Sequence, residues 1–176
     1  MSQRDQATLS VPVTKEDHIE GGDTAAVTLV EYGDYQCPYC GQAYGLLKTI
    51  QREMGRSLRF VFRNFPLTNA HPFAEAAAEA AESAAGQGKF WEMHDLLYQN
   101  QDRLGQDLIV EAATSLGLDV ERFVKDLNAR KYKDRVHRDF MGGVRSGVNG
   151  TPCFFIDGVR FEGNWVSGEL AGALKR

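Results

Sequence analysis

Two cysteines, Cys37 and Cys40, are the residues of this chain whose type and spacing most directly suggest chemistry. They enclose Pro38 and Tyr39 in the sequence Cys-Pro-Tyr-Cys. Two cysteines three positions apart on the first turn of a helix are close enough to form a small disulfide ring, and such a ring opens and closes by exchange with thiols of another protein. The motif therefore predicts a redox-active dithiol.

The flanking sequence places this motif between a strand and a helix. The apolar run Val27–Val30 before it is typical of a strand that is covered on both faces. The apolar positions after it follow helical spacing: Ala43, Leu47, Ile50 and Met54. Pro38 suits the first position of a helix, where its missing N–H is not needed. We therefore expect a buried helix to begin at Pro38, with Cys37 at its N-terminus.

A helix N-terminus favours the thiolate of Cys37, which is the attacking species in disulfide exchange. The helix dipole contributes about 0.3–1 kcal/mol, and up to about 2 in sheltered geometry, which lowers the pKa by about one unit. A larger shift needs hydrogen bonds to the sulfur. Pro38 cannot donate one, so the N–H groups of Tyr39 and Cys40 and the Cys40 thiol remain. We expect Cys37 to be the nucleophile and the more buried Cys40 to resolve the mixed disulfide.

The composition is that of an ordinary globular protein. The chain has 176 residues, of which 43% are hydrophobic, and 20 basic residues against 24 acidic ones. The net charge of −4 gives no electrostatic reason to expect nucleic acid or an anionic membrane as partner. Residues 1–15 lack the apolar core of a signal peptide, and no run reaches the ~20 apolar residues of a membrane span. We expect a monomer that is cytoplasmic, or periplasmic or extracellular if a signal has been removed.

The rest of the chain divides into a polar start, a strand-rich part and a helical block. Residues 1–25 are interpreted as an arm or short edge element. Residues 26–68 and 149–176 carry strand patterns, including the period-two alternation of Leu58–Asn64. Between them, residues 69–148 show only helical patterns, with four or five helices expected. Glu75, Glu79 and Glu82 are interpreted as the solvent-facing side of the first of these helices.

A second strand pair is predicted after the helical block. Residues 153–161 fit a strand, a two-residue turn at Asp157-Gly158 and a returning strand. Pro152 directly precedes the first of these strands. A cis peptide bond between Thr151 and Pro152 would explain a proline at this position, and a proline at a strand's first residue sacrifices no ladder hydrogen bond.

Together these motifs resemble the DsbA-like thiol-disulfide oxidoreductases, in which a helical domain interrupts a thioredoxin fold. The shared features are the strand followed by the Cys-Pro-Tyr-Cys motif, the stretch Arg63–Leu67, the helical insertion, and Thr151-Pro152 before a strand. The resemblance implies an α/β fold with a central mixed sheet flanked by helices. It covers nearly everything from Ala26 onward.

The same resemblance implies a set of functional residues and partners. Thr151 and Pro152 would form a loop facing the dithiol and bind polypeptide substrates, together with Pro38 and Tyr39. Glu31 would correspond to the buried carboxylate that exchanges a proton with the resolving cysteine, and burial would raise its pKa. No cofactor or metal is implied. The expected partners are polypeptides with thiols or disulfides and a redox partner, either a protein or glutathione.

One departure from the family concerns Tyr39, because strongly oxidising members carry histidine at this position. A neutral phenol supplies no positive charge to hold the thiolate, so we expect a weaker oxidant. The alternatives are a glutathione-linked reductase or a disulfide isomerase. The Cys-Pro-Tyr-Cys quartet is associated with glutaredoxins, but the helical block argues against that family.

Several other interpretations stay open at this point. Cys153 is either a small core residue, which we favour, or a third redox-active thiol. Glu31 could be an ordinary carboxylate at the end of a strand. His18, His71, His94 and His137 lack the spacing of a metal chelate, and His71 is interpreted as a capping or core histidine. A zinc-binding module and a redox-inert peptide binder are the less favoured functions.

Overall fold

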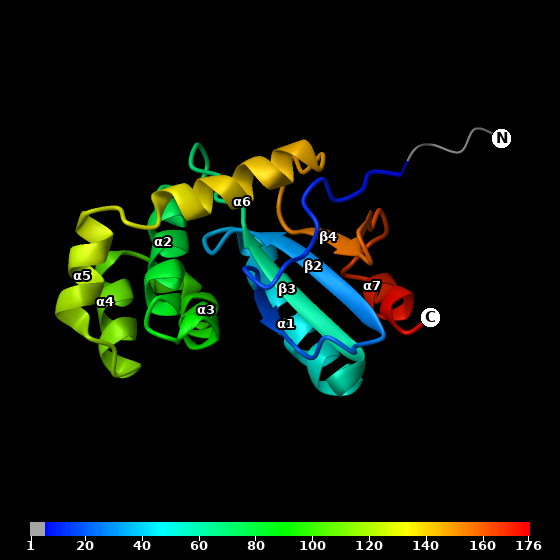
Figure 1. Ribbon diagram of the computed structural model, residues 1–176, viewed down its shortest axis with the longest axis horizontal. Helices are drawn as coiled ribbons and strands as arrows, with labels where there is room; N and C mark the ends of the chain where they lie inside the picture. The colour runs from blue at the N-terminus through cyan, green and yellow to red at the C-terminus, as the bar shows by residue number, and fades with distance from the viewer. Residues whose placement is uncertain (1–5) are drawn as a thin grey trace.

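The computed structural model describes residues 6–176, in which five strands form one mixed sheet with the order β1-β3-β2-β4-β5 (Figure 1). The strands are β1 (His18–Glu20), β2 (Val27–Gly33), β3 (Leu58–Asn64), β4 (Cys153–Ile156) and β5 (Val159–Arg160). Strands β2 and β3 run parallel, and the other neighbouring pairs are antiparallel. The α/β fold with a central mixed sheet is therefore confirmed.

Helices cover the sheet and extend beyond one of its edges. Helix α1 (Pro38–Met54) follows β2, the short 3-10 helix η1 (Gly55–Ser57) leads into β3, and α7 (Glu169–Leu174) closes the chain. Between β3 and β4 lie the remaining helices: α2 (Ala74–Ala85), α3 (Phe90–Gln99), η2 (Gln101–Arg103), α4 (Gln106–Ser115), α5 (Val120–Asn128) and α6 (Lys133–Arg145). In Figure 1, α2 to α5 form a group beside the sheet, and α6 leads back to it.

The alternation of side chains along β2 creates two hydrophobic layers. Leu29 points to one face, where it packs with Leu47 and Ile50 of α1. Val30 and Tyr32 point to the other face, which is covered by residues of the N-terminal segment and by Phe140 of α6. Phe140 stacks on Phe65 with ring centroids 4.3 Å apart. Helix α6 therefore packs against the sheet, although it belongs to the block predicted from residues 69–148.

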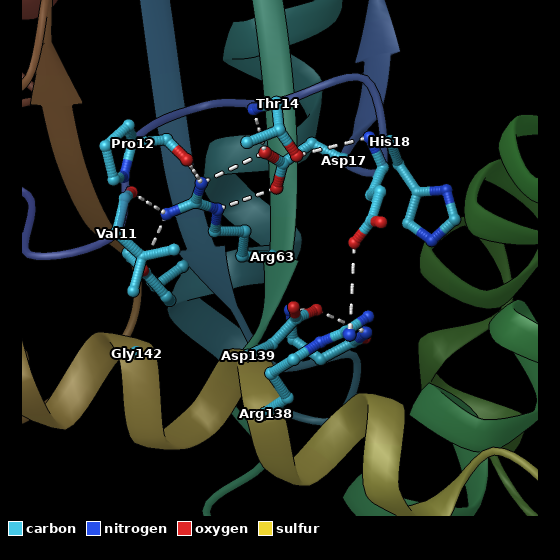
Figure 2. A network of polar contacts seen from close by, with 12 residues as sticks. Val11, Pro12, Thr14, Asp17, His18, Arg63, Arg138, Asp139 and Gly142 are labelled. Carbon is cyan, nitrogen blue, oxygen red and sulfur yellow. Dashed lines mark hydrogen bonds and ion pairs between the residues drawn. The ribbon is translucent and has the colours of Figure 1, made fainter.

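The N-terminal segment crosses this second face from one edge of the sheet to the other. Thr8 forms a β-bridge with Val159 at one edge, and β1 pairs with β3 at the other. Between them, the buried guanidinium of Arg63 donates hydrogen bonds to the carbonyls of Val11 (2.8 Å) and Pro12 (3.0 Å) and to both carboxylate oxygens of Asp17 (2.8 and 3.0 Å), as Figure 2 shows. Arg63 thus fixes the segment to β3.

Helix α2 departs from the sequence-based expectation, because Glu79 and Glu82 are buried rather than solvent-facing. Arg130 pairs with Glu79 at 2.7 Å, and His18 lies 2.9 Å from a Glu82 oxygen. Helical periodicity predicts one apolar face, but α2 is packed against α3, α5 and α6. Neighbours on several sides leave no wide solvent-facing stripe, so the acids are satisfied by ion pairs and hydrogen bonds instead.

Among residues 6–176, none of the helices is both long enough and apolar enough to span a bilayer.

Candidate active site

The Cys-Pro-Tyr-Cys motif occupies the junction between β2 and α1. Cys37 is the N-cap residue of α1, and Pro38 is its first residue, as the sequence predicts. The Cys37 side chain is nearly covered, with 4% of the residue exposed, and Cys40 is fully buried one turn further into the helix. Tyr39 projects outward and is 62% exposed. The motif therefore exposes Tyr39, leaves Cys37 nearly covered and buries the second sulfur completely.

The two sulfurs have opposite acidities. A hydrogen bond from the Cys40 thiol lowers the pKa of Cys37 to about 5. Burial opposes this shift, whereas the Thr151 side chain and the backbone N–H groups of Cys40 and Tyr39 assist it. Burial, and the same hydrogen bond to Cys37, raise the pKa of Cys40 well above its usual value. The lowering of the Cys37 pKa exceeds what the helix dipole provides. It comes from the donors expected from the sequence, which are the Cys40 thiol and the two N–H groups, and from Thr151 in addition. Cys37 is thus a thiolate at neutral pH while Cys40 keeps its proton.

The loop before β4 lies against Cys37. The Thr151–Pro152 peptide bond is cis. Sγ of Cys37 lies 3.5 Å from the Thr151 carbonyl oxygen, which accepts a hydrogen bond from the thiol when Cys37 is protonated, and 114 positions of sequence separate the two residues. The fold therefore brings Thr151, which is followed by the cis-bonded Pro152 and lies far from the motif in sequence, into contact with Cys37.

Glu31 lies on the central strand β2, six residues before Cys37. It is 2% exposed and pairs in the sheet with Phe62 on one side and Phe154 on the other. Burial, and to a smaller degree the charge of Cys37, raises the pKa of Glu31 to about 8. The charge of Glu31 in turn raises the pKa of Cys40. The carboxyl group is therefore coupled electrostatically to both sulfurs.

Comparison with known proteins agrees with this geometry. A family model described as thioredoxin matches residues 13–176. The chain belongs to the thioredoxin family. Among solved structures, BdbD from Bacillus subtilis in its oxidised form superposes with a TM-score of 0.84 at 22% identity, covering 97% of each chain.

Two further structures show the same fold. A thioredoxin-like oxidoreductase from Silicibacter pomeroyi has a TM-score of 0.73 at 25% identity, covering 93% of this chain and 95% of that one. The thiol-disulfide exchange protein α-DsbA2 from Wolbachia pipientis has a TM-score of 0.73 at 19% identity, covering 91% and 88%. The chain is thus a DsbA-like member of the thioredoxin family in its fold.

The curated relatives in sequence carry a different name. The Na(+)/H(+) antiporter NhaA 1 from Salinispora arenicola is 44% identical over 167 residues, which are 94% of this chain and 26% of that protein. NhaA 1 from a Mycobacterium species is 43% identical over 171 residues, which are 96% of this chain and 28% of that protein. The thioredoxin-family chain therefore spans about a quarter of the length of the curated relatives that it matches.

Cys153 lies apart from the dithiol of this thioredoxin-family site. It pairs with Tyr32 across β2 and β4 and belongs to the hydrophobic layer on the α6 side of the sheet. Cys37 and Cys40 belong to the layer on the α1 side. Burial raises the pKa of Cys153. These observations support the interpretation of Cys153 as a small core residue.

Sequence reasoning missed two polar residues that contact the active-site turn. Asp34 is 1% exposed, and its carboxylate accepts hydrogen bonds from the backbone N–H groups of Gln36 (2.7 Å) and Cys37 (3.2 Å). An aspartate whose side chain can bind the backbone N–H two residues on is a recognisable turn signal just before a helix, so Asp34 could have been found. Gln101, in contrast, lies in η2 and has no local sequence signal.

His71 occupies neither of the positions expected from the sequence. Its Nδ1 lies 2.8 Å from Oδ2 of Asp34, and 19% of its side chain is exposed. It is therefore neither a helix cap nor a core residue, because it binds a carboxylate at the active-site turn. Within the part of the chain that the structure describes, no group of His, Cys, Asp and Glu side chains is arranged to hold a metal ion.

Proposed function

We propose that the protein is a thiol-disulfide oxidoreductase that exchanges disulfides with polypeptide substrates through Cys37 and Cys40. The observation that carries this proposal is the contrast between the two sulfurs, with the pKa of Cys37 lowered to about 5 and that of Cys40 raised. Such a contrast assigns one sulfur as nucleophile and leaving group and the other as the resolving thiol. Membership in the thioredoxin family supports the same assignment.

In the oxidising direction, the enzyme starts with a disulfide between Cys37 and Cys40. A substrate thiolate attacks Sγ of Cys37, forming a mixed disulfide and breaking the bond to Cys40, which leaves as a thiolate. Glu31 is mostly protonated at pH 7 because its pKa is about 8, so it is suited to give Cys40 a proton. This is the proton-transfer role that we propose for Glu31.

A second substrate thiolate then attacks the substrate sulfur of the mixed disulfide. The substrate gains its disulfide, and Cys37 leaves as a stable thiolate. Two substrate thiols have lost two electrons and two protons; the electrons reduce the enzyme disulfide, one proton ends on Cys40 and the other enters solvent. All steps reverse when Cys37 attacks a substrate disulfide and Cys40, deprotonated by Glu31, resolves it.

The acidity of Cys37 bears on which direction dominates. A stabilised thiolate favours the reduced enzyme and therefore makes its disulfide more oxidising. The sequence favours a weaker oxidant because Tyr39 carries no charge, but hydrogen bonds to the sulfur lower the pKa of Cys37 without one. We therefore propose that oxidation of substrate thiols is favoured, which suits an oxidising compartment outside the cytosol. A glutathione-linked reductase or an isomerase is the alternative.

The substrate is proposed to be an extended segment of polypeptide. The Thr151-Pro152 loop would offer it backbone groups beside Cys37, and Tyr39 with Pro38 would contact it from the α1 side. The 62% exposure of Tyr39 supports this contact, since a large aromatic side chain is free there to pack on a partner. The antiporter activity named for the relatives is not proposed for this chain, because the match covers about a quarter of their length.

The decisive experiment is to measure the equilibrium between dithiol and disulfide across glutathione redox buffers. The fraction of alkylated Cys37 and Cys40 is read by mass spectrometry, with Cys37→Ala as the control that cannot form the pair. A potential above that of the glutathione pool would indicate an oxidase, and one at or below it a reductase or exchange enzyme. Absence of any reversible disulfide would refute the proposed function.

A further inference from the structure

We propose that the helical block positions the dithiol by holding the active-site turn at two points, through the Asp34–His71 pair and through Gln101. The inference rests on the proposed function, because it concerns how Cys37 acquires its low pKa. Asp34, His71 and Gln101 are positioning residues, since none of them contacts the sulfur of Cys37.

The first point of attachment is the carboxylate of Asp34, whose two oxygens bind different segments. Oδ1 accepts hydrogen bonds from the N–H groups of Gln36 (2.7 Å) and Cys37 (3.2 Å), both in the turn that leads into α1. Oδ2 accepts from the N–H of Leu67 (2.9 Å) and lies 2.8 Å from Nδ1 of His71, both in the segment that leads from β3 into the helical block. One carboxylate thus joins the active-site turn to the start of the helices.

Only a carboxylate can make this connection. An ionised Asp accepts about four hydrogen bonds through two oxygens, which is the number present here. An Asn side chain has a single oxygen and would turn an NH₂ group toward two N–H donors. Because the Asp34 side chain has no exposed surface, a lost partner there would not be replaced by bulk water.

Asp34 also contacts the second sulfur through its backbone. Its N–H donates to Sγ of Cys40 at 3.5 Å, and its carbonyl oxygen accepts from the N–H of Cys37 at 3.2 Å. The orientation of Cys40 matters because its thiol provides the largest stabilisation of the Cys37 thiolate. A displacement of Asp34 would therefore reach both cysteines.

The second point of attachment is Gln101 in η2. Its Nε2 donates to the backbone carbonyls of Tyr35 and Cys37, each at 2.8 Å. A Cβ added to Gly41 would lie 2.3 Å from Oε1 of Gln101, so the amide is packed closely against the first turn of α1. The helical block therefore holds the turn at its carbonyls as well as at its N–H groups.

The test is the pKa of the Cys37 thiol in the reduced protein, taken from the pH dependence of its alkylation rate. We expect His71→Ala to raise this pKa by about one unit, a tenfold loss of thiolate stabilisation, because the turn loses a charged hydrogen bond that fixes Asp34. His71→Asn, which keeps an N–H donor near the position of Nδ1, should restore most of the acidity. His137→Ala, which changes an exposed histidine on α6, is the matched control.

Gln101→Ala tests the second attachment in the same assay, with Gln106→Ala as the control at an exposed glutamine of α4. An upward shift in Gln101→Ala and none in Gln106→Ala is expected. The free energy of unfolding is measured for every variant. If His71→Ala and Gln101→Ala lower stability but leave the Cys37 pKa unchanged, the residues are purely structural and the inference is wrong. Because alkylation needs no substrate, this outcome is distinct from failure of the proposed function, which is an absent reversible disulfide.

Discussion

Cys153 and Cys37 lie on opposite faces of the central sheet, although Cys153 follows the Thr151-Pro152 loop that contacts Cys37. The reason is the period of two along a strand: Phe154 points to the α1 side, so Cys153 and Phe155 point to the α6 side. Proximity in sequence to the active loop therefore does not give access to the dithiol.

The first prediction concerns this separation. Cys153→Ala should leave the redox potential of the Cys37/Cys40 pair unchanged, because the side chain does not reach the dithiol. It should lower the free energy of unfolding by about 1 kcal/mol through the small cavity it creates. Redox titration and urea unfolding measure the two quantities. A change of potential comparable with that of an active-site variant would contradict the placement of Cys153.

The second prediction concerns the acidity of Cys37. The ultraviolet absorbance of the thiolate in the reduced protein should titrate with a midpoint at about pH 5 and disappear in Cys37→Ser. Because pH 7 lies two units above that pKa, ionisation of Cys37 stabilises the reduced form by about two factors of ten. Each factor of ten changes the redox potential of a two-electron couple by about 30 mV. The disulfide should therefore be about 60 mV more oxidising at pH 7 than one with an unperturbed thiol. A midpoint above pH 8 would show that the hydrogen bonds to the sulfur are ineffective.

The third prediction concerns Glu31, whose pKa burial raises to about 8. A raised carboxyl pKa gives stability that is fully present below the ordinary value of about 4.5 and is lost as the pH rises through about 8. Glu31→Gln should match the wild type near pH 4 and exceed its free energy of unfolding by about 3–5 kcal/mol at pH 9.

Urea unfolding of the disulfide form isolates the part of this effect that burial causes, since Cys37 carries no charge in that form and its smaller contribution to the pKa of Glu31 is absent. Glu121→Gln, a substitution of an exposed glutamate in the first turn of α5, serves as the control. A pH profile that is identical for wild type and Glu31→Gln would mean that Glu31 is not buried in its ionised form.

The fourth prediction concerns the ion pair between Arg63 and Asp17. Their side chains are 3% and 8% exposed, so Asp17→Asn leaves a buried guanidinium without its counter-charge and should cost about 3–5 kcal/mol. Although burial alone would raise it, the hydrogen bond from Arg63 lowers the pKa of Asp17. The stabilisation is therefore present above the ordinary carboxyl range and is lost as the pH falls through the lowered value.

The measurement is the free energy of unfolding at pH 7 and at acidic pH, with hydrogen exchange of residues 7–20 to follow the N-terminal segment. Glu16→Gln, at an acid whose side chain is 69% exposed, is the matched control. Equal destabilisation by both variants, or a loss that does not diminish toward low pH, would argue against the role of the Asp17 charge.

The sequence by itself determined the elements and the chemistry that is local in the chain. An apolar strand, a Cys-Pro-Tyr-Cys motif and a helical period fix Cys37 at the start of α1, because these patterns depend on neighbours only a few residues apart. The same local logic predicted β3, the turn at Asp157-Gly158 and the cis bond before Pro152. The limits of the structural units at residues 25, 68 and 148 stay predictions.

Only the tertiary structure decided which distant residues meet at the dithiol and which are kept from it. Asp34 binds His71, and Gln101 binds the Cys37 carbonyl, in each case across more than thirty positions of sequence. The periodicity of the sequence does not predict contacts of this kind. Glu82 was expected on the solvent-facing side of its helix, and it is buried because residues of other elements pack against that side. Side-chain acidity follows from solvent exclusion and hydrogen-bond geometry, and both exist only once these separated segments have packed together.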